Sequence, residues 1–186
     1  MTLFHNKYRI ETARLKGWDY SNDGLYFVTI CTHGRECLFG QIIDGEMKLN
    51  AIGEIVKQEW EKTNEIRKSV ELNEYIIMPN HFHAIIGIWN ENYQRVDNKR
   101  RDALQCVSTL ESPHNFGKNN LSNIIRGFKS STTRKINEYR NTPGKPVWQT
   151  RFYDHIIRYE KEFNNILIYI VNNPINWIED DYFELN

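Results

Sequence analysis

The chain has 186 residues, and its 24 Lys and Arg residues balance its 24 Asp and Glu residues. Hydrophobic residues make up 40% and charged residues 26%, which is ordinary for a globular protein and argues against wholesale disorder. No apolar run approaches the roughly 20 residues of a membrane helix, and residues 1–16 lack the hydrophobic stretch of a secretory signal. Three cysteines are too few for a disulfide framework. We therefore expect one domain spanning residues 1–186, in the cytoplasm and without a membrane partner.

The charges are segregated along the chain although they sum to zero. Residues 118–158 carry nine Lys or Arg residues against two acidic ones, whereas residues 159–186 carry six acidic residues against one lysine. Residues 1–20 form a second basic stretch, which we expect to be an N-terminal arm. Such asymmetry is typical of nucleic-acid contact, but a solvated helix face would show it equally well.

The first half of the chain begins with strand and helix patterns. Residues 25–32 are rich in β-branched and aromatic side chains and predict a buried strand. Residues 38–49 contain Asp44-Gly45 between strand-like segments, which predicts a hairpin. Asn50 is a typical N-terminal cap for a helix that keeps its apolar period through Ile66.

Two apolar segments follow, 70–78 and 81–89, and predict adjacent strands joined by a tight corner at Pro79-Asn80. Residues 90–120 are polar, with little periodicity, and predict a long loop or insertion.

The last third of the chain is mainly helical in its pattern. Residues 121–139 and 160–172 have helical apolar periods, and residues 147–157 between them look like an aromatic and basic connector. The predicted elements follow one another as strands, a helix, further strands and then helices. This order predicts an α+β fold with a mixed sheet.

The sharpest local feature is His81-Phe82-His83. In a strand, residues i and i+2 point to the same face, so both imidazoles project together while Phe82 turns away. Two neutral imidazoles can share one divalent ion, although this spacing also occurs by chance. The other histidines do not complete a zinc cage, so two histidines with an oxygen ligand favour Mg²⁺ or Mn²⁺ acting on a phosphate.

The last predicted helix offers Tyr169 and Asn173, four residues apart and therefore on one face. Asn173 can give the ion a carbonyl oxygen, and Tyr169 would stand beside it to attack a phosphate. A free phenol has a pKa near 10 and needs a neighbouring positive charge to become a useful nucleophile. The alternative is that Tyr169 packs in the core and Asn173 caps the helix before Pro174.

Five motifs together resemble the REP-associated single-tyrosine transposases of the HUH endonuclease group. In chain order they are 78–83 (Met-Pro-Asn-His-Phe-His), 128–130 (Phe-Lys-Ser), 146–149 (Pro-Val-Trp-Gln), 152–158 (Phe-Tyr-Asp-His-Ile-Ile-Arg) and 169–174 (Tyr-Ile-Val-Asn-Asn-Pro). The similarity runs from about Tyr26 to Trp177, which is most of the chain. Each motif alone is loose, but the ordered set is specific.

The resemblance implies a ferredoxin-like α+β sandwich whose central, mainly antiparallel sheet carries the His-x-His strand. It also implies cleavage and rejoining of single-stranded DNA by a tyrosine, through a 5′-phosphotyrosine link and a free 3′-hydroxyl. His81 and His83 match the paired ligands of a Mg²⁺ or Mn²⁺ ion, and Asn173 falls where a helical polar residue can complete the site. Tyr169 matches the nucleophile, with Tyr153 as the runner-up because it also lies in a family-like motif.

Single-stranded or hairpin DNA is the partner that the resemblance implies, in the cytoplasm and at the nucleoid. The expected DNA-contacting residues are Arg126, Lys129, Arg134, Lys135, Trp148, Arg151 and Arg158. The basic arm would reach a groove, and the 90–120 loop would contact a hairpin. A homodimer is one expectation for the oligomeric state.

Three functions remain open at this point. The first is the metal-dependent single-strand DNA transesterase. The second is a domesticated, non-catalytic binder of DNA hairpins. The third is a two-histidine metal hydrolase of small phosphoesters, against which the sequence near His81 shows no cluster of acidic ligands.

Overall fold

The computed structural model describes residues 3–4, 7–8, 18–89, 120–180 and 182. At its centre is a four-stranded antiparallel sheet with the order β6-β7-β3-β8. The strands are β3 (Gly24–Cys31), β6 (Val70–Ile77), β7 (His81–Ile88) and β8 (Tyr153–Ile157).

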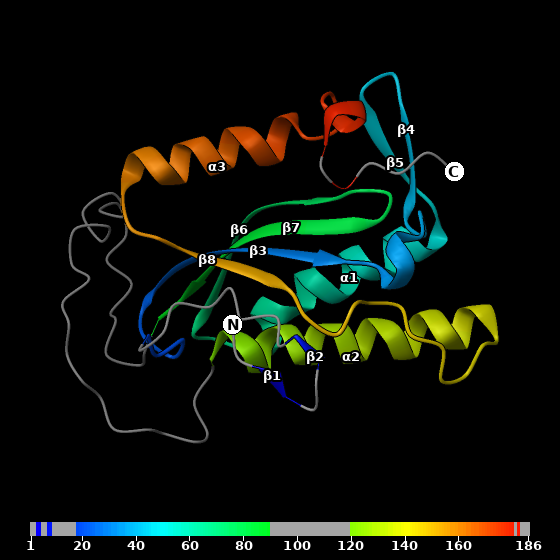
Figure 1. Cartoon of the computed structure of the whole chain (residues 1–186), viewed down its shortest axis with the longest axis horizontal. Helices are drawn as coiled ribbons and strands as arrows, with labels where there is room; N and C mark the ends of the chain where they lie inside the picture. Colours follow the sequence, from blue (N-terminus) through cyan, green and yellow to red (C-terminus); the bar gives the residue numbers. More distant parts are fainter. Residues whose placement is uncertain (1–2, 5–6, 9–17, 90–119, 181, 183–186) are drawn as a thin grey trace.

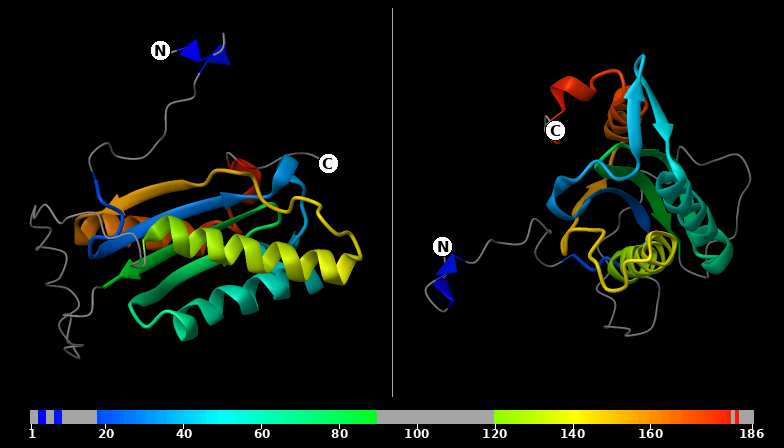
Figure 2. Two further views of the ribbon diagram at one scale, coloured as in Figure 1. Left: turned by 90° about the horizontal axis from the view of Figure 1, so that it is seen from below. Right: turned by 90° about the vertical axis from the view of Figure 1, so that its right-hand side faces the viewer.

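Helices cover both faces of this sheet. The helices are α1 (Ala51–Ile66), α2 (Leu121–Arg140) and α3 (Glu160–Asn172). Figure 2 shows α1 and α2 together on one face and α3 alone on the other. No helix in the described part of the chain is long and apolar enough to cross a membrane.

The chain order of these elements gives the ferredoxin-like sandwich (Figure 1). The unit β3-α1-β6 leaves a gap that β7 fills, and the unit β7-α2-β8 encloses β3 in the same way. This interleaving makes every neighbouring pair antiparallel, so the mixed sheet expected from the order of the elements is wrong. The α+β, ferredoxin-like prediction is therefore confirmed.

Local sequence explains most of the element boundaries. Asn50 accepts hydrogen bonds from the backbone N–H groups of Ile52 and Gly53, which caps α1 as predicted. Asp44 and Gly45 have φ angles of 52° and 74°, the left-handed pair of a tight hairpin turn between β4 (Gly40–Ile43) and β5 (Glu46–Leu49). Both predictions are confirmed.

One element was predicted wrongly. Residues 153–157 lie in a strand, β8, and not in a connector. They pair with residues 25–29 of β3 at the edge of the sheet. The segment is short and polar residues interrupt it, so its alternation is too brief to stand out from an irregular connection.

Two predicted segments fall largely or wholly outside the described residues. The 90–119 part of the long loop is one of them. Of the 1–20 arm, the structure describes residues 18–20 and the short paired strands β1 (Leu3–Phe4) and β2 (Lys7–Tyr8).

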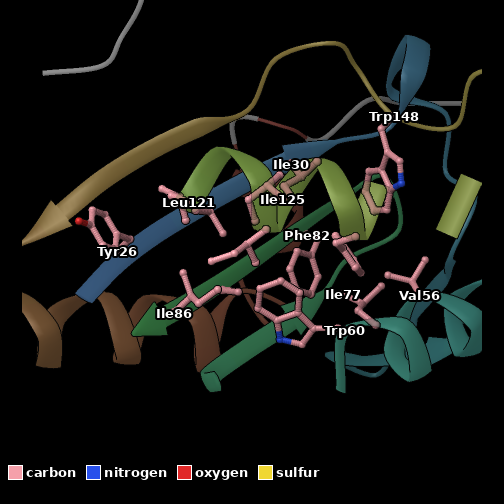
Figure 3. Packing of buried hydrophobic residues seen from close by; sticks show 14 of the residues in the cluster. Tyr26, Ile30, Val56, Trp60, Ile77, Phe82, Ile86, Leu121, Ile125 and Trp148 are labelled. Atoms are coloured by element: carbon pink, nitrogen blue, oxygen red, sulfur yellow. The ribbon is translucent and has the colours of Figure 1, made fainter. Parts of the chain in front are cut away.

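The larger hydrophobic core lies between the sheet and the α1–α2 layer (Figure 3). Phe82 on β7 is fully buried there, and its ring centroid is 4.8 Å from that of Trp60 and 5.4 Å from that of Phe128. A smaller core under α3 contains Phe27, Ile85 and other apolar residues. Because strand side chains alternate, anchoring Phe82 in the first core turns His81 and His83 toward α3.

We expect Phe82→Ala to lower the free energy of unfolding by about 3–5 kcal/mol, because it leaves a cavity among the rings of Trp60, Tyr75 and Phe128. Urea denaturation measures the loss. Ile66→Ala, at a residue that is 76% exposed, is the matched control and should change the free energy by less than about 0.5 kcal/mol. Equal effects of the two substitutions would contradict this view of the core.

Candidate active site

Strand register places the two histidines beside β3. Residues paired across the sheet point to the same face, and His81 lies opposite Cys31 while His83 lies opposite Thr29. The two imidazole ring centroids are 4.5 Å apart, and both residues are almost completely buried. The predicted convergence of the imidazoles is therefore present in the structure.

The hydrogen bonds of His81 define which of its nitrogens carries a proton. Asn80 donates its amide N–H to the carbonyl oxygen of Tyr182 at 2.8 Å, so its side-chain oxygen is left to face Nδ1 of His81 at 2.9 Å. That oxygen only accepts, so Nδ1 must donate to it. Nε2 of His81 therefore carries a lone pair, and this buried atom has no hydrogen-bond partner among the described residues.

His83 is held in a similar way. Its Nδ1 is 2.8 Å from the hydroxyl oxygen of Thr29, and its Nε2 is 3.2 Å from the hydroxyl of Tyr169 on α3. The ring of Phe27 stacks against the imidazole, with centroids 5.4 Å apart. An outer hydrogen bond of this kind orients a histidine that binds metal through its other nitrogen.

Burial keeps both imidazoles neutral. Loss of hydration lowers the pKa of His81 to about 4, against the opposing influence of the Asp180 carboxylate and the Asn173 amide. Burial, and then the neighbouring His81, lower the pKa of His83 well below its usual 6.5. Neutral imidazole is the form that ligates a metal ion.

Asp180 completes a group that could hold a metal ion. One ligand atom from each of His81, His83 and Asp180 lies within 4.8 Å of the other two. The carboxylate is held from two sides, because Asn173 donates its amide N–H to Oδ2 at 2.7 Å and the backbone N–H of Tyr182 donates to Oδ1 at 2.7 Å. Sequence analysis missed Asp180, which lies almost one hundred residues after the histidines in an acidic stretch.

The donor atoms fit a divalent cation. Asn173 is buried, and its side-chain oxygen, like Nε2 of His81, has no hydrogen-bond partner among the described residues. An unpaired buried polar atom is costly, and a shared cation would satisfy both. Two imidazole nitrogens with carboxylate and amide oxygens suit several divalent ions, including Mn²⁺. Asn173 thus holds Asp180 in place through its amide nitrogen, and its amide oxygen is left beside the group. Its role as a metal ligand stays a prediction.

The two candidate tyrosines occupy different positions. Tyr169 is 43% exposed, and its hydroxyl contacts the imidazole of His83, so the alternative of a core-packed Tyr169 does not describe this structure. The other part of that alternative is confirmed, because Asn173 is the C-terminal cap of α3. Tyr153 is 46% exposed, and its ring contacts that of Phe27, with 6.3 Å between the centroids. Tyr182 is a third phenol at the site, with its ring centroid 4.7 Å from that of His81.

The predicted DNA-contacting residues do not form one group. Arg126, Lys129 and Arg134 line a groove of about 930 Å³ between α2 and residues 143–152. Lys129 also donates hydrogen bonds to the backbone oxygens of Gln149 and Thr150.

The remaining four residues of that set are placed differently. Trp148 also lines the groove but is only 6% exposed, and its Nε1 donates to Thr132 at 2.8 Å. Lys135 instead binds Glu59 of α1 at 2.6 Å. Arg151 precedes β8 in the sequence and Arg158 follows it, and both residues are exposed.

Comparison with known proteins gives a family and a fold. No protein-family model matches the chain. A Haemophilus influenzae protein described as uncharacterized is 40% identical over 172 residues, which cover 92% of each chain. The chain therefore belongs to the same family as that protein.

Among solved structures, a REP-associated tyrosine transposase bound to a REP hairpin has a TM-score of 0.55 at 20% identity, covering 88% of this chain and 74% of that one. The chain thus shares the fold of that transposase. A candidate transposase of Deinococcus radiodurans covers 86% of this chain and 95% of its own at 14% identity, with a TM-score of 0.41, too low to establish a common fold.

We expect Mn²⁺ to bind the purified protein at one site, and Asp180→Asn to weaken that binding by at least the 10- to 100-fold loss typical of changes around a metal centre. The substitution removes the negative charge but keeps the size of the side chain. Isothermal titration calorimetry measures the affinity. Glu138→Gln, at an exposed carboxylate on α2, should bind Mn²⁺ like the unmodified protein. Unchanged affinity in Asp180→Asn would contradict the assignment.

The metal-free protein should lose stability as the pH falls from about 6.5 toward 4. The pKa values of His81 and His83 are lower in the folded chain than in the unfolded chain, where they are about 6.5, so the unfolded state takes up protons first. Urea denaturation in the presence of a chelator measures the decline. His81→Asn/His83→Asn should flatten the profile over this range; a profile as steep as that of the unmodified protein would refute the explanation.

Proposed function

We propose that the protein is a metal-dependent single-strand DNA endonuclease and strand transferase of the single-tyrosine transposase type. The observation that carries the proposal is that the hydroxyl of Tyr169 lies 3.2 Å from Nε2 of His83. His83 belongs to the group that could hold a metal ion. A partly exposed phenol beside buried, neutral imidazoles and a carboxylate suits nucleophilic attack on a phosphodiester.

His81, His83 and Asp180, with Asn173 as a further oxygen donor, would hold the ion. Bound Mg²⁺ or Mn²⁺ would neutralise phosphate charge and favour loss of the phenol proton. The oxygen of Tyr169 then forms a bond to phosphorus, and the bond between phosphorus and the 3′-oxygen breaks. The 3′-oxygen takes up a proton, and the 5′-phosphate stays on the tyrosine. Attack by a 3′-hydroxyl reverses the reaction and joins strands, so no ATP is required.

Hairpin-forming DNA is the substrate class that we infer, with the reaction in the cytoplasm at the nucleoid. The groove lined by Arg126, Lys129 and Arg134 offers positive charge for a phosphate backbone. The transposase that shares the fold is bound to a REP hairpin. Both observations support DNA as the partner.

The two alternatives are weaker in the light of the geometry. A non-catalytic hairpin binder would not need a phenol placed against a buried imidazole. A hydrolase of small phosphoesters gains support from Asp180, the acidic ligand that sequence analysis did not find. Such a hydrolase would use water, and not a tyrosine, as its nucleophile. The hydrolase function therefore does not explain why the hydroxyl of Tyr169 lies beside His83.

Incubation with Mn²⁺ and a single-stranded hairpin oligonucleotide should give a protein–DNA adduct that survives denaturation. Tyr169→Phe should abolish the adduct, because it removes only the attacking oxygen. Tyr153→Phe is the matched control and should retain it. Denaturing gel electrophoresis with oligonucleotides labelled at either end shows which side of the break is attached.

An adduct that persists in Tyr169→Phe and disappears in Tyr153→Phe would assign the nucleophile to Tyr153. Turnover of a small phosphoester without any adduct would favour the hydrolase. Salt-sensitive DNA binding that is unaffected by His81→Ala, again without an adduct, would favour the non-catalytic binder.

A further inference from the structure

A second groove lies beside the candidate nucleophile. It has a volume of about 530 Å³ and runs between the edge strand β8 and the first half of α3. Phe27 and Ile166 contribute apolar surface, and Tyr153, Tyr159 and Lys161 are among the other lining residues. None of these residues takes part in the candidate metal group.

The ring of Phe27 links this groove to the candidate active site. It stacks on the imidazole of His83, and its centroid is 6.2 Å from that of Tyr169 and 6.3 Å from that of Tyr153. Both phenol rings meet Phe27 edge to face. A chain whose phosphate lies at Tyr169 can therefore place a neighbouring group in the groove.

The groove presents exposed aromatic surface. Tyr153 is 46% exposed and Tyr159 is 68% exposed. Aromatic rings that line an open groove provide stacking surface for flat ligands, and every nucleobase has a face that can stack on them. The polar side chain of Asn165 lines the same groove and can bond to a base edge.

The charge of the groove is compatible with a nucleic acid. Glu162 is its acidic lining residue, and both of its carboxylate oxygens already accept hydrogen bonds, one from His155 at 2.6 Å and one from the backbone N–H of Arg158 at 2.8 Å. Lys161 lines the groove as well and can neutralise a phosphate.

We propose that this groove binds one unpaired nucleobase of the DNA strand that Tyr169 attacks, close to the scissile phosphate, with the ring of Tyr153 stacking on the base. The inference rests on the proposed function and adds a base-binding subsite to it. It also assigns Tyr153 the role of a binding residue whose ring, rather than its hydroxyl, is required.

Tyr169→Phe protein, which should bind DNA without cleaving it, is the background for the test. Fluorescence anisotropy measures the affinity for a hairpin oligonucleotide with single-stranded flanks. Adding Tyr153→Leu should weaken binding by about 5- to 150-fold, the range found when a base loses its aromatic partner. Tyr153→Phe should preserve binding. Tyr139→Leu removes a tyrosine that is 62% exposed on α2 and lines neither groove, so it should have no effect.

An abasic scan locates the base. Removing the base that occupies the groove should weaken binding to the parental protein, and Tyr153→Leu should then cause no further loss on that oligonucleotide. If Tyr153→Leu binds every oligonucleotide as tightly as the parental protein while unmodified protein still forms the Tyr169 adduct, the subsite is refuted and the proposed function stands. Absence of both DNA binding and adduct would refute the two together.

Discussion

The placement of Phe82 is the constraint on which the candidate site depends. Its ring packs against the rings of Trp60 and Phe128 on one face of the sheet. Because the side chains of a strand alternate, His81 and His83 must then face α3. A slip of one residue in the pairing of β7 with β3 would bury both imidazoles in the larger core and expose Phe82 to the site. Packing of Phe82 in the larger core therefore determines where the candidate metal ligands lie.

The buried imidazoles of His81 and His83 are oriented by hydrogen bonds with neighbouring side chains. Asn80 and Thr29 each contact the Nδ1 atom of a histidine, which directs both Nε2 atoms inward. The buried atoms that remain without a partner in the described part of this site are Nε2 of His81 and the side-chain oxygen of Asn173. These atoms come from β7 and from the end of α3, so occupation of the site by a cation would tie the two elements together.

Much of the fold could be predicted from local patterns, since hydrophobic periods, the Asn50 cap and the Asp44-Gly45 turn act over a few residues. His81 and His83 were predictable as a pair for the same reason. Asp180 was not, because only the turns after α3 bring it back to the sheet, and no spacing in the sequence encodes that path. The edge strand β8 was missed because its interrupted alternation gives a weak signal.

The central claim is that His81, His83 and Asp180 bind a divalent ion beside the hydroxyl of Tyr169. A crystal structure of the protein with Mn²⁺, using anomalous scattering at the manganese edge, tests it most directly. The account predicts one strong anomalous peak about 2.1 Å from both Nε2 atoms and from a carboxylate oxygen of Asp180. The absence of an anomalous peak at this site at saturating Mn²⁺ would contradict the claim. A peak whose ligands are other residues, with the Tyr169 side chain pointing away from it, would contradict it as well.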